Sequence, residues 1–292
     1  MKLLFIHAHF DDYEFTAAGA FEIWRQSLGE SCQTRVVVCT DGESGHHFRT
    51  REETGRLRLN EQLASARIGG YDFQLLRLSN GRFPREACLD RTPGLLPALW
   101  KTIREFEPDY LFCPPLAPDP LAGVHIDHLA LAEAVRKVAY LINVPHCFTP
   151  EYPAEETRSE PCKVPVIINV HDSYMVPGAF DFAMDVESAF PKIAEMSYCH
   201  KSQIMEWLPW IGRHSMDPPK SMEDWRQILR KRYLRKNAAL GIPSDHAVEV
   251  FTVTAWGEVP TCPQLLADLP HIMPDAKRLA GLEQRLELWR SA

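Results

Sequence analysis

The sequence lacks the features that mark several large classes of protein. None of its eight cysteines forms a Cys-x-x-Cys pair, which argues against a thiolate zinc cluster or a dithiol redox motif. No apolar run approaches the roughly 18 residues that cross a bilayer. Met1 and Lys2 are followed by only four apolar residues before His7, too few for a signal peptide. We therefore expect neither a membrane span nor a secretory leader.

Positive charge is also scarce. The 292 residues include 32 Lys and Arg against 39 Asp and Glu, a net charge of -7. A general nucleic-acid or anionic-membrane binder would need a basic surface, so we expect no nucleic-acid partner. Cys39 and Cys113 end apolar strand-like runs, where a buried free thiol is the common state. This pattern favours reduced cysteines and a cytoplasmic protein, with disulfides in a secreted protein as the alternative.

The N-terminal half alternates short apolar runs with amphipathic stretches. Strands are expected at 3–6, 36–39, 75–78 and 110–113, and helices at 16–28, 52–68, 95–106 and 127–141. Short apolar strands separated by helices of this length predict βαβ units and a parallel sheet.

The second half is less regular. Residues 149–165 are expected to form a surface loop and 213–222 a Pro-rich connection, with strands at 166–170 and 248–253 and helices at 188–207, 224–240 and 279–289. The sequence thus predicts a Rossmann-like three-layer α/β fold with a mainly parallel sheet and C-terminal elaborations. We expect one domain over residues 1–210 and an extension, 211–292, packed on the same domain.

A first short motif of acidic residues and histidine, here called a word, directly follows the first expected strand: His9-Phe10-Asp11-Asp12. Adjacent carboxylates there can simply cap the next helix, which is the plain structural alternative. However, neighbouring side chains of an extended or turning segment point in different directions. One carboxylate can therefore bind a metal while the other faces a reacting water.

A second word, His125-Ile126-Asp127-His128, precedes the helix expected at 127–141. The start of a helix would place His125 and His128 on one side, although two unrelated surface histidines remain the alternative in a chain with 12 His. Asp127 between them suits acceptance of the spare N–H of a ligand histidine.

Both words lie where a strand end hands over to a helix, and strand carboxyl ends line the ligand crevice of an open α/β sheet. Together they supply two histidines and one aspartate for a zinc-like ion, with a carboxylate and an imidazole to spare. Three protein ligands and an open position are typical of a catalytic zinc site, not a structural one.

These words resemble those of the LmbE-like, or PIG-L, superfamily of zinc-dependent N-deacetylases. Its signature is A-H-P-D-D-E near the N-terminus and H-x-D-H before a later helix. The similarity covers roughly residues 1–210. Five further words follow the family pattern: Thr40 to Glu43 for T-x-G-E, Arg58 to Glu61 for R-x-x-E, Asn80-Gly81 for D-G, Pro108-Asp109 for P-D, and His200 to Gln203 for H-x-S-Q.

The resemblance implies a role for each matching residue. His9, Asp12 and His128 would bind Zn²⁺, with another divalent metal left open. Asp11 would act as general base, and His125 would assist the tetrahedral intermediate.

Four more residues receive an expected role, and two depart from the family pattern. Asp127 is placed with the catalytic set, and Arg58, Glu43 and Asn80 with substrate binding. Phe10 stands where the family has Pro, which we interpret as a change in local packing. Tyr13 stands where it has Glu, which removes a carboxylate beside the expected metal site.

The implied function is hydrolysis of an acyl amide on a small molecule, an N-acetyl amino sugar or its conjugate. The alternatives are an amidase for a thiol conjugate or natural product, a pocket-bearing protein without turnover, and a nucleotide-binding Rossmann module. The last is disfavoured because the first strand is followed by acidic groups in place of G-x-G-x-x-G. A homo-oligomer stays open.

A local cluster of arginines allows one further expectation. Arg49, Arg51 and Arg56 lie close to Arg58 in sequence. A solvated helix face is the plainer interpretation, and the functional one is a clamp for an anionic substrate group.

Overall fold

The computed structural model describes residues 1–117, 119, 121–158, 160–172, 179–212 and 216–291. Within these residues one seven-stranded sheet has the strand order β3-β2-β1-β4-β5-β7-β6. Its strands are β1 (Lys2–His7), β2 (Gln33–Val38), β3 (Asp72–Leu75), β4 (Tyr110–Cys113), β5 (Val166–Val170), β6 (Phe182–Asp185) and β7 (Val248–Val253).

Strands β1 to β5 pair in parallel, whereas β7 runs antiparallel to both of its neighbours. The strand order reverses between β1 and β4, which pair through Leu3 with Tyr110 and Phe5 with Phe112. In open α/β sheets such a reversal opens a crevice at the strand carboxyl ends. The expected Rossmann-like fold with a mainly parallel sheet is confirmed.

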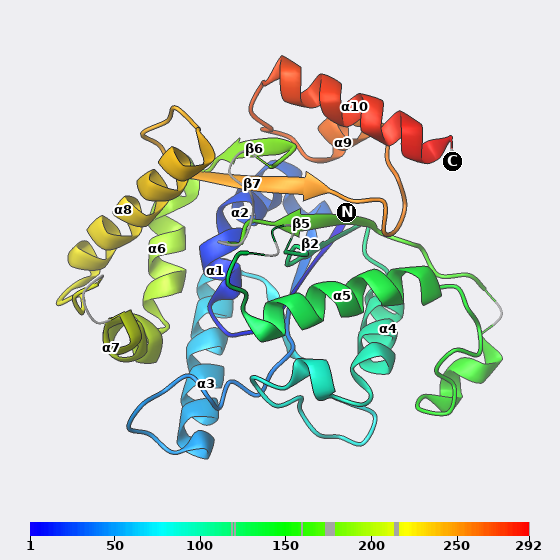
Figure 1. Ribbon diagram of the computed structural model, residues 1–292, viewed down its shortest axis with the longest axis horizontal. Helices are drawn as coiled ribbons and strands as arrows, with labels where there is room; N and C mark the ends of the chain where they lie inside the picture. The colour runs from blue at the N-terminus through cyan, green and yellow to red at the C-terminus, as the bar shows by residue number, and fades with distance from the viewer. Residues whose placement is uncertain (118, 120, 159, 173–178, 213–215, 292) are drawn as a thin grey trace.

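Helices cover both faces of the sheet because alternate residues of β1 are apolar on both sides. Leu3 and Phe5 pack in one core cluster with α2, α6 and α8, and Leu4 and Ile6 pack in another with α4 and α5. Figure 1 shows α6 and α8 on one side of the sheet and α4 and α5 on the other. The helices are α1 (Asp12–Thr16), α2 (Ala18–Leu28), α3 (Arg51–Gly69), α4 (Leu95–Phe106), α5 (Ile126–Leu141), α6 (Phe190–Tyr198), α7 (Leu208–Gly212), α8 (Met222–Leu240), α9 (Cys262–Asp268) and α10 (Ala276–Arg290).

Some expected elements are displaced or divided. The strand expected at 75–78 was wrong by three residues, since β3 spans Asp72–Leu75 and is a half-exposed edge strand that needs no apolar run. The helix expected at 16–28 is α2, which begins two residues later, and it is preceded by a short helix, α1, that was not expected. The helix expected at 188–207 ends at Tyr198 and resumes as a π-helical turn over Ser202–Trp207.

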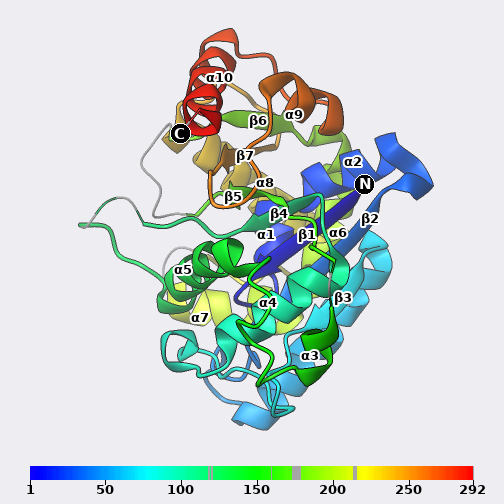
Figure 2. The ribbon, with the colours of Figure 1, turned by 90° about the vertical axis from the view of Figure 1, so that its right-hand side faces the viewer.

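The last quarter of the chain is built into the sheet. Strand β7 lies between β5 and β6, so residues on both sides of position 210 form adjacent strands. Figure 2 shows α9 and α10 at the β6 edge, at the end of the molecule away from α3. In the described ranges, no helix combines the length and apolar character needed to cross a bilayer.

Candidate active site

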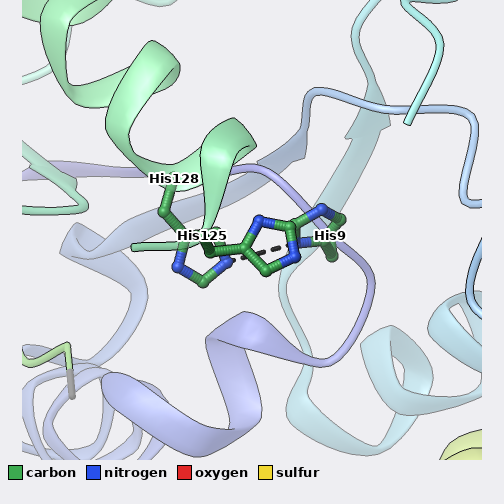
Figure 3. Close-up of side chains that lie close together, drawn as sticks. All are labelled: His9, His125 and His128. Carbon is green, nitrogen blue, oxygen red and sulfur yellow. Dashed lines mark hydrogen bonds between the residues drawn. The ribbon is translucent and has the colours of Figure 1, made fainter. Parts of the chain in front are cut away.

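The two acidic-histidine words meet at the carboxyl ends of β1 and β4. β1 ends at His7, the turn after it carries His9, and α1 begins at Asp12. Helix α5 begins at Ile126 with His125 as its N-cap, which brings His128 to the same place. Figure 3 shows His9, His125 and His128 converging. Their ring centroids lie 4.5 to 5.1 Å apart.

Three side-chain atoms form a nearly equilateral triangle. His9 Nδ1 lies 3.1 Å from His128 Nε2 and 3.4 Å from Asp12 Oδ2, and the latter two atoms are 3.5 Å apart. Ligands bound about 2.1 Å from a tetrahedral ion lie roughly 3.4 Å from one another. The spacing therefore fits three ligands of a single ion. The described residues also contain two overlapping potential ligand groups, His9 with His125 and His128, and His7 with Asp12 and His128.

Two further carboxylates hold the histidines in place. His9 Nε2 lies 3.1 Å from Asp127 Oδ2, and His128 Nδ1 lies 2.6 Å from Asp172 Oδ2. Each carboxylate accepts the ring N–H that faces it, which leaves the other nitrogen, with its lone pair, inside the triangle. Sequence reasoning identified Asp127 for this kind of contact and missed Asp172, which follows β5.

These carboxylates create a strongly negative potential. Burial alone would lower the pKa of His9, but hydrogen bonds with Asp12 and Asp127 outweigh it and raise the pKa to about 9. His128 behaves alike: Asp12 and Asp172 overcome its burial and raise the pKa to about 10. Two facing ring nitrogens 3.1 Å apart require a proton or another cation between them. The cluster is thus built to hold positive charge.

The Asp11 carboxyl lies near Arg58 and is not among the three atoms of the triangle, to which its neighbour Asp12 contributes. Asp11 has a left-handed backbone (φ 84°), and its Oδ1 lies 3.9 Å from Arg58 Nη2. Burial raises the pKa of Asp11 to about 6, although the Arg58 guanidinium opposes the shift. A carboxyl with such a pKa can exchange protons near neutral pH.

His125 and His7 flank the triangle. His125 Nδ1 accepts the backbone N–H of Asp127 at 3.3 Å, and burial lowers the pKa of His125 to about 4, so the ring is neutral with its proton on Nε2. His7 Nδ1 lies 2.5 Å from Asp12 Oδ2 and helps to fix that carboxylate.

Arg58 is buried beneath the site. Its exposed fraction is 2%, and it donates to the Phe10 carbonyl at 3.1 Å and to Glu86 at 3.2 Å. Glu86 is a partner that sequence reasoning missed. The guanidinium thus ties the first word to the segment after β3, and its role in substrate binding stays a prediction.

The word that contains Arg58 is joined to the one from His200 to Gln203. Glu61 accepts from both the backbone N–H and the hydroxyl of Ser202, at 2.8 and 2.6 Å. Gln203 donates to the Gly45 carbonyl at 3.3 Å. Segments far apart in the sequence are therefore joined by hydrogen bonds, and together they support the loops after β1 and β2.

Phe10 packs against Gly42 in the segment from Thr40 to Glu43. A Cβ at Gly42 would lie only 2.3 Å from the Phe10 ring, and Gly42 has a φ of +67°, so that position has no room for a side chain. Tyr13 turns into the core beside Phe5 and Tyr71.

Glu14, which sequence reasoning missed, supplies a buried carboxylate one residue after Tyr13. It accepts hydrogen bonds from Ser65 and Tyr71 at 2.5 and 2.9 Å, and His200 Nε2 lies 3.3 Å away. Tyr13 thus replaces the Glu of the family pattern, and the next residue, Glu14, supplies a carboxylate that has different partners.

The remaining substrate candidates lie outside the triangle. Glu43 pairs with Arg51 at 3.2 Å, and Arg49 pairs with Glu206 at 2.8 Å. Asn80 lies in an exposed turn, where it accepts the backbone N–H of Arg82. Substrate binding by Glu43 and Asn80 stays a prediction.

A hollow of about 280 Å³ opens beside the triangle. One side, here called the strand wall, includes His7, Asp12, His128 and Asp172, and the other side, the α8 wall, includes Leu229, Arg232, Tyr233 and Lys236. The C-terminal part of the chain therefore shapes the space next to the candidate metal ligands.

Residues 4–139 match the sequence model of the PIG-L family, described as GlcNAc-PI de-N-acetylase, which confirms the resemblance expected from the words. No curated protein sequence matches the chain.

Several solved structures share the fold. N,N'-diacetylchitobiose deacetylase from Pyrococcus horikoshii is 18% identical with a TM-score of 0.62, over 94% of this chain and 88% of that one. 4-Carboxy-2-hydroxymuconate hydratase from Pseudomonas putida is 16% identical with a TM-score of 0.57, over 87% and 95%. A conserved protein from Thermus thermophilus is 21% identical with a TM-score of 0.57, over 86% and 93%. At these identities the likeness shows the fold alone.

Proposed function

We propose that this chain, whose residues 4–139 form a PIG-L family domain, is a metal-dependent amide hydrolase. It removes an N-acyl group, most simply acetyl, from a small amino-sugar-like molecule or its conjugate. The observation that carries the proposal is the triangle of His9 Nδ1, Asp12 Oδ2 and His128 Nε2, with the carboxyl of Asp11 next to it in the chain.

The metal ligands are His9, Asp12 and His128. Zn²⁺ suits this set because it accepts imidazole nitrogen and carboxylate oxygen in tetrahedral geometry, and other divalent ions bind the same donors. When bound, such an ion polarises the amide carbonyl and lowers the pKa of water to about 7. Asp127 and Asp172 keep both imidazoles in the tautomer that the ion requires.

Asp11 moves the proton. Its pKa of about 6 lets it take a proton from the attacking water and return it to the leaving amine nitrogen near neutral pH. Arg58, 3.9 Å away, limits the rise of this pKa and helps to keep the carboxyl ionised before attack.

His125 stabilises the negative charge that develops on the carbonyl oxygen. Its Nδ1 is occupied by the Asp127 backbone N–H, so Nε2 carries the proton and can donate it in a hydrogen bond. A neutral donor held in place by the N-cap of α5 costs no reorganisation during the reaction.

The test is amine release from a panel of N-acyl compounds by the zinc-loaded protein. We expect equal amounts of primary amine and carboxylic acid, loss of turnover with a chelator and recovery with Zn²⁺. A hydratase shares the fold, and hydration releases no amine, so hydration must be assayed in parallel. Hydration of unsaturated carboxylic acids without amine release from any amide would contradict the proposal.

The panel also separates the alternatives within amide chemistry. If amine is released from thiol conjugates or natural-product amides but not from amino sugars, the substrate class changes and the mechanism is retained. Tight metal binding without turnover would indicate a non-catalytic binding protein. The eight free thiols support the expected cytoplasmic location. A homo-oligomer stays open, and the boundary at residue 210 stays a prediction.

A further inference from the structure

Two cationic side chains of the α8 wall face the hollow. Arg232 and Lys236 are four residues apart on α8, so they lie one above the other on the same side of the helix. They face a strand wall that includes Asp12 and Asp172. The hollow therefore has an acidic side near the candidate metal ligands and a basic side on the C-terminal helix.

Neither cation forms an ion pair among the residues that the structure describes. The Arg232 guanidinium lies over the Phe15 ring at 4.4 Å, and Lys236 Nζ lies over the Tyr233 ring at 4.4 Å. These contacts orient the charges without neutralising them. The undescribed residues include no Asp or Glu, so no acidic side chain in them can supply the missing partner.

The two carboxylates that act most strongly on these cations have other partners. Asp11, which acts on Arg232, lies 3.9 Å from Arg58. Glu249, which acts on Lys236, accepts the backbone N–H groups of Gly19 and Ala20 at 3.0 and 2.8 Å.

Burial of an unpaired cation is unfavourable. Lys236 is half-buried, and its burial lowers its pKa to about 8. Among the other basic residues of α8, Arg230 pairs with Glu187, and Arg226 lies 3.9 Å from Glu195 of α6. Lys231 and Arg235, which are exposed like Arg232, have no ion pair among the described residues and do not line the hollow. An anion in the hollow would give Arg232 and Lys236 the partner that the chain does not provide.

The arginines near the first half of the site are poorer candidates. Arg58 is paired with Glu86, Arg49 with Glu206 and Arg51 with Glu43. Their charges are compensated within the protein. The cationic function expected from the sequence around Arg58 therefore has its better counterpart on α8.

We propose that Arg232 and Lys236 bind an anionic group of the substrate, a carboxylate or a phosphate, while the amide lies at the strand wall. This assignment rests on the proposed function and adds a substrate class to it, N-acyl compounds that carry an acidic group. Guanidinium and ammonium donors suit both kinds of anion. With its acidic group at the α8 wall and its amide at the strand wall, the substrate is held in one orientation.

The test measures binding of inorganic phosphate and of acetate to the zinc-loaded protein by calorimetry. The double variant Arg232→Gln with Lys236→Gln should bind the preferred anion about 10–100-fold more weakly, because two charge-assisted contacts are lost. Lys231→Gln with Arg235→Gln is the matched control: it removes the same charge from the same helix, at residues that do not line the hollow. Its affinity should change less than about twofold.

A charge-preserving variant guards against misfolding. Arg232→Lys with Lys236→Arg should fold and retain most of the affinity, and a melting curve is recorded for each protein. Three outcomes would overturn the proposal. Both neutralised variants could lose the same amount of anion affinity, neither could lose any, or the unaltered protein could bind no anion. Preference for phosphate over acetate, or the reverse, identifies the acidic group.

Turnover then links the anion to the reaction. For any amide that the protein hydrolyses, KM should rise in the Arg232 and Lys236 variant for the acidic substrate and stay unchanged for its neutral analogue. If no amide is hydrolysed, the proposed function fails while the calorimetric result still decides whether the anion subsite exists.

Discussion

The strand wall and the α8 wall treat charge in opposite ways. At the strand wall and the triangle beside it, every proposed ligand is held by a second group: His9 by Asp127, His128 by Asp172, and Asp12 by His7. On the α8 wall, Arg232 and Lys236 touch aromatic rings and form no ion pair among the described residues. The charges of the strand wall are compensated within the protein, and those of the α8 wall are not.

The difference indicates a division of labour. A compensated wall is rigid before anything binds, which suits groups that must present lone pairs with little error. An uncompensated wall gains its partners only when a ligand arrives, which suits recognition. The hollow thus joins chemistry encoded near the N-terminus to selection encoded near the C-terminus.

The sharpest way to break this comparison is to remove a ligand from the strand wall. His128→Ala should abolish metal binding and turnover, because two side chains cannot replace the three-ligand set. Metal content by mass spectrometry measures the effect, and His146→Ala is the control, since that histidine is 68% exposed and pairs only with Glu156 at the surface. Full metal content in His128→Ala would remove this residue from the ligand set.

Asp11→Asn separates chemistry from metal binding next to the proposed ligands. Turnover should fall about 10²–10⁴-fold, the usual contribution of a general base, with metal content unchanged. Asn tolerates the left-handed backbone of position 11, so the variant adds little strain. Loss of the metal in Asp11→Asn, with its retention in Asp12→Asn, would reverse the two roles.

Asp172→Asn tests whether compensation on the strand wall matters. Asn can still accept the His128 N–H but lacks the negative charge, so metal affinity should fall about 10–100-fold. Competition with a fluorescent chelator measures it. Asp245→Asn, at a side chain that is 97% exposed, is the matched control. Equal affinities in the two variants would show that Asp172 does not tune the metal site.

Trp225→Phe asks whether the strand wall depends on the α8 wall. Trp225 is fully buried, and its Nε1 donates to Ser197 Oγ on α6 at 2.9 Å. Loss of this hydrogen bond should lower the free energy of unfolding by about 1–3 kcal/mol, measured in urea. Trp210→Phe, at a 44% exposed residue, should cost less. Metal content should be normal in both, and its loss in Trp225→Phe would mean that the walls are coupled.

Four elements with a strong apolar signal were predicted to the residue, whereas β1 and β2 begin before the apolar runs expected at 3–6 and 36–39. β4, β5, β7 and α4 have the bounds expected from the sequence. All but α4 are inner strands, whose neighbours demand apolar side chains on both faces. The two edge strands were not predicted: β3, whose residues are exposed or half-buried, was misplaced, and β6, which is only four residues long, was missed.

The site divides in the same way. His9, Asp12 and His128 were predictable because short words of rare composition carry them. Asp172 was not, because an isolated carboxylate after a strand acquires its meaning only from the pairing of β4 with β5. Arg232 and Lys236 read as part of a solvated helix face in sequence, and only the docking of α8 against Phe15 reveals where they point.

The insertion of β7 between β5 and β6 also sets a timetable for folding on the ribosome. The five residues of β5 are buried in the finished protein, yet its outer edge has no partner until β7 has been made. The ribosome must add 83 residues between Val170 and Val253, which takes roughly 4–17 s at about 5–20 residues per second. During that interval the nascent chain presents a bare strand edge, the kind of surface that chaperones shield and that promotes aggregation.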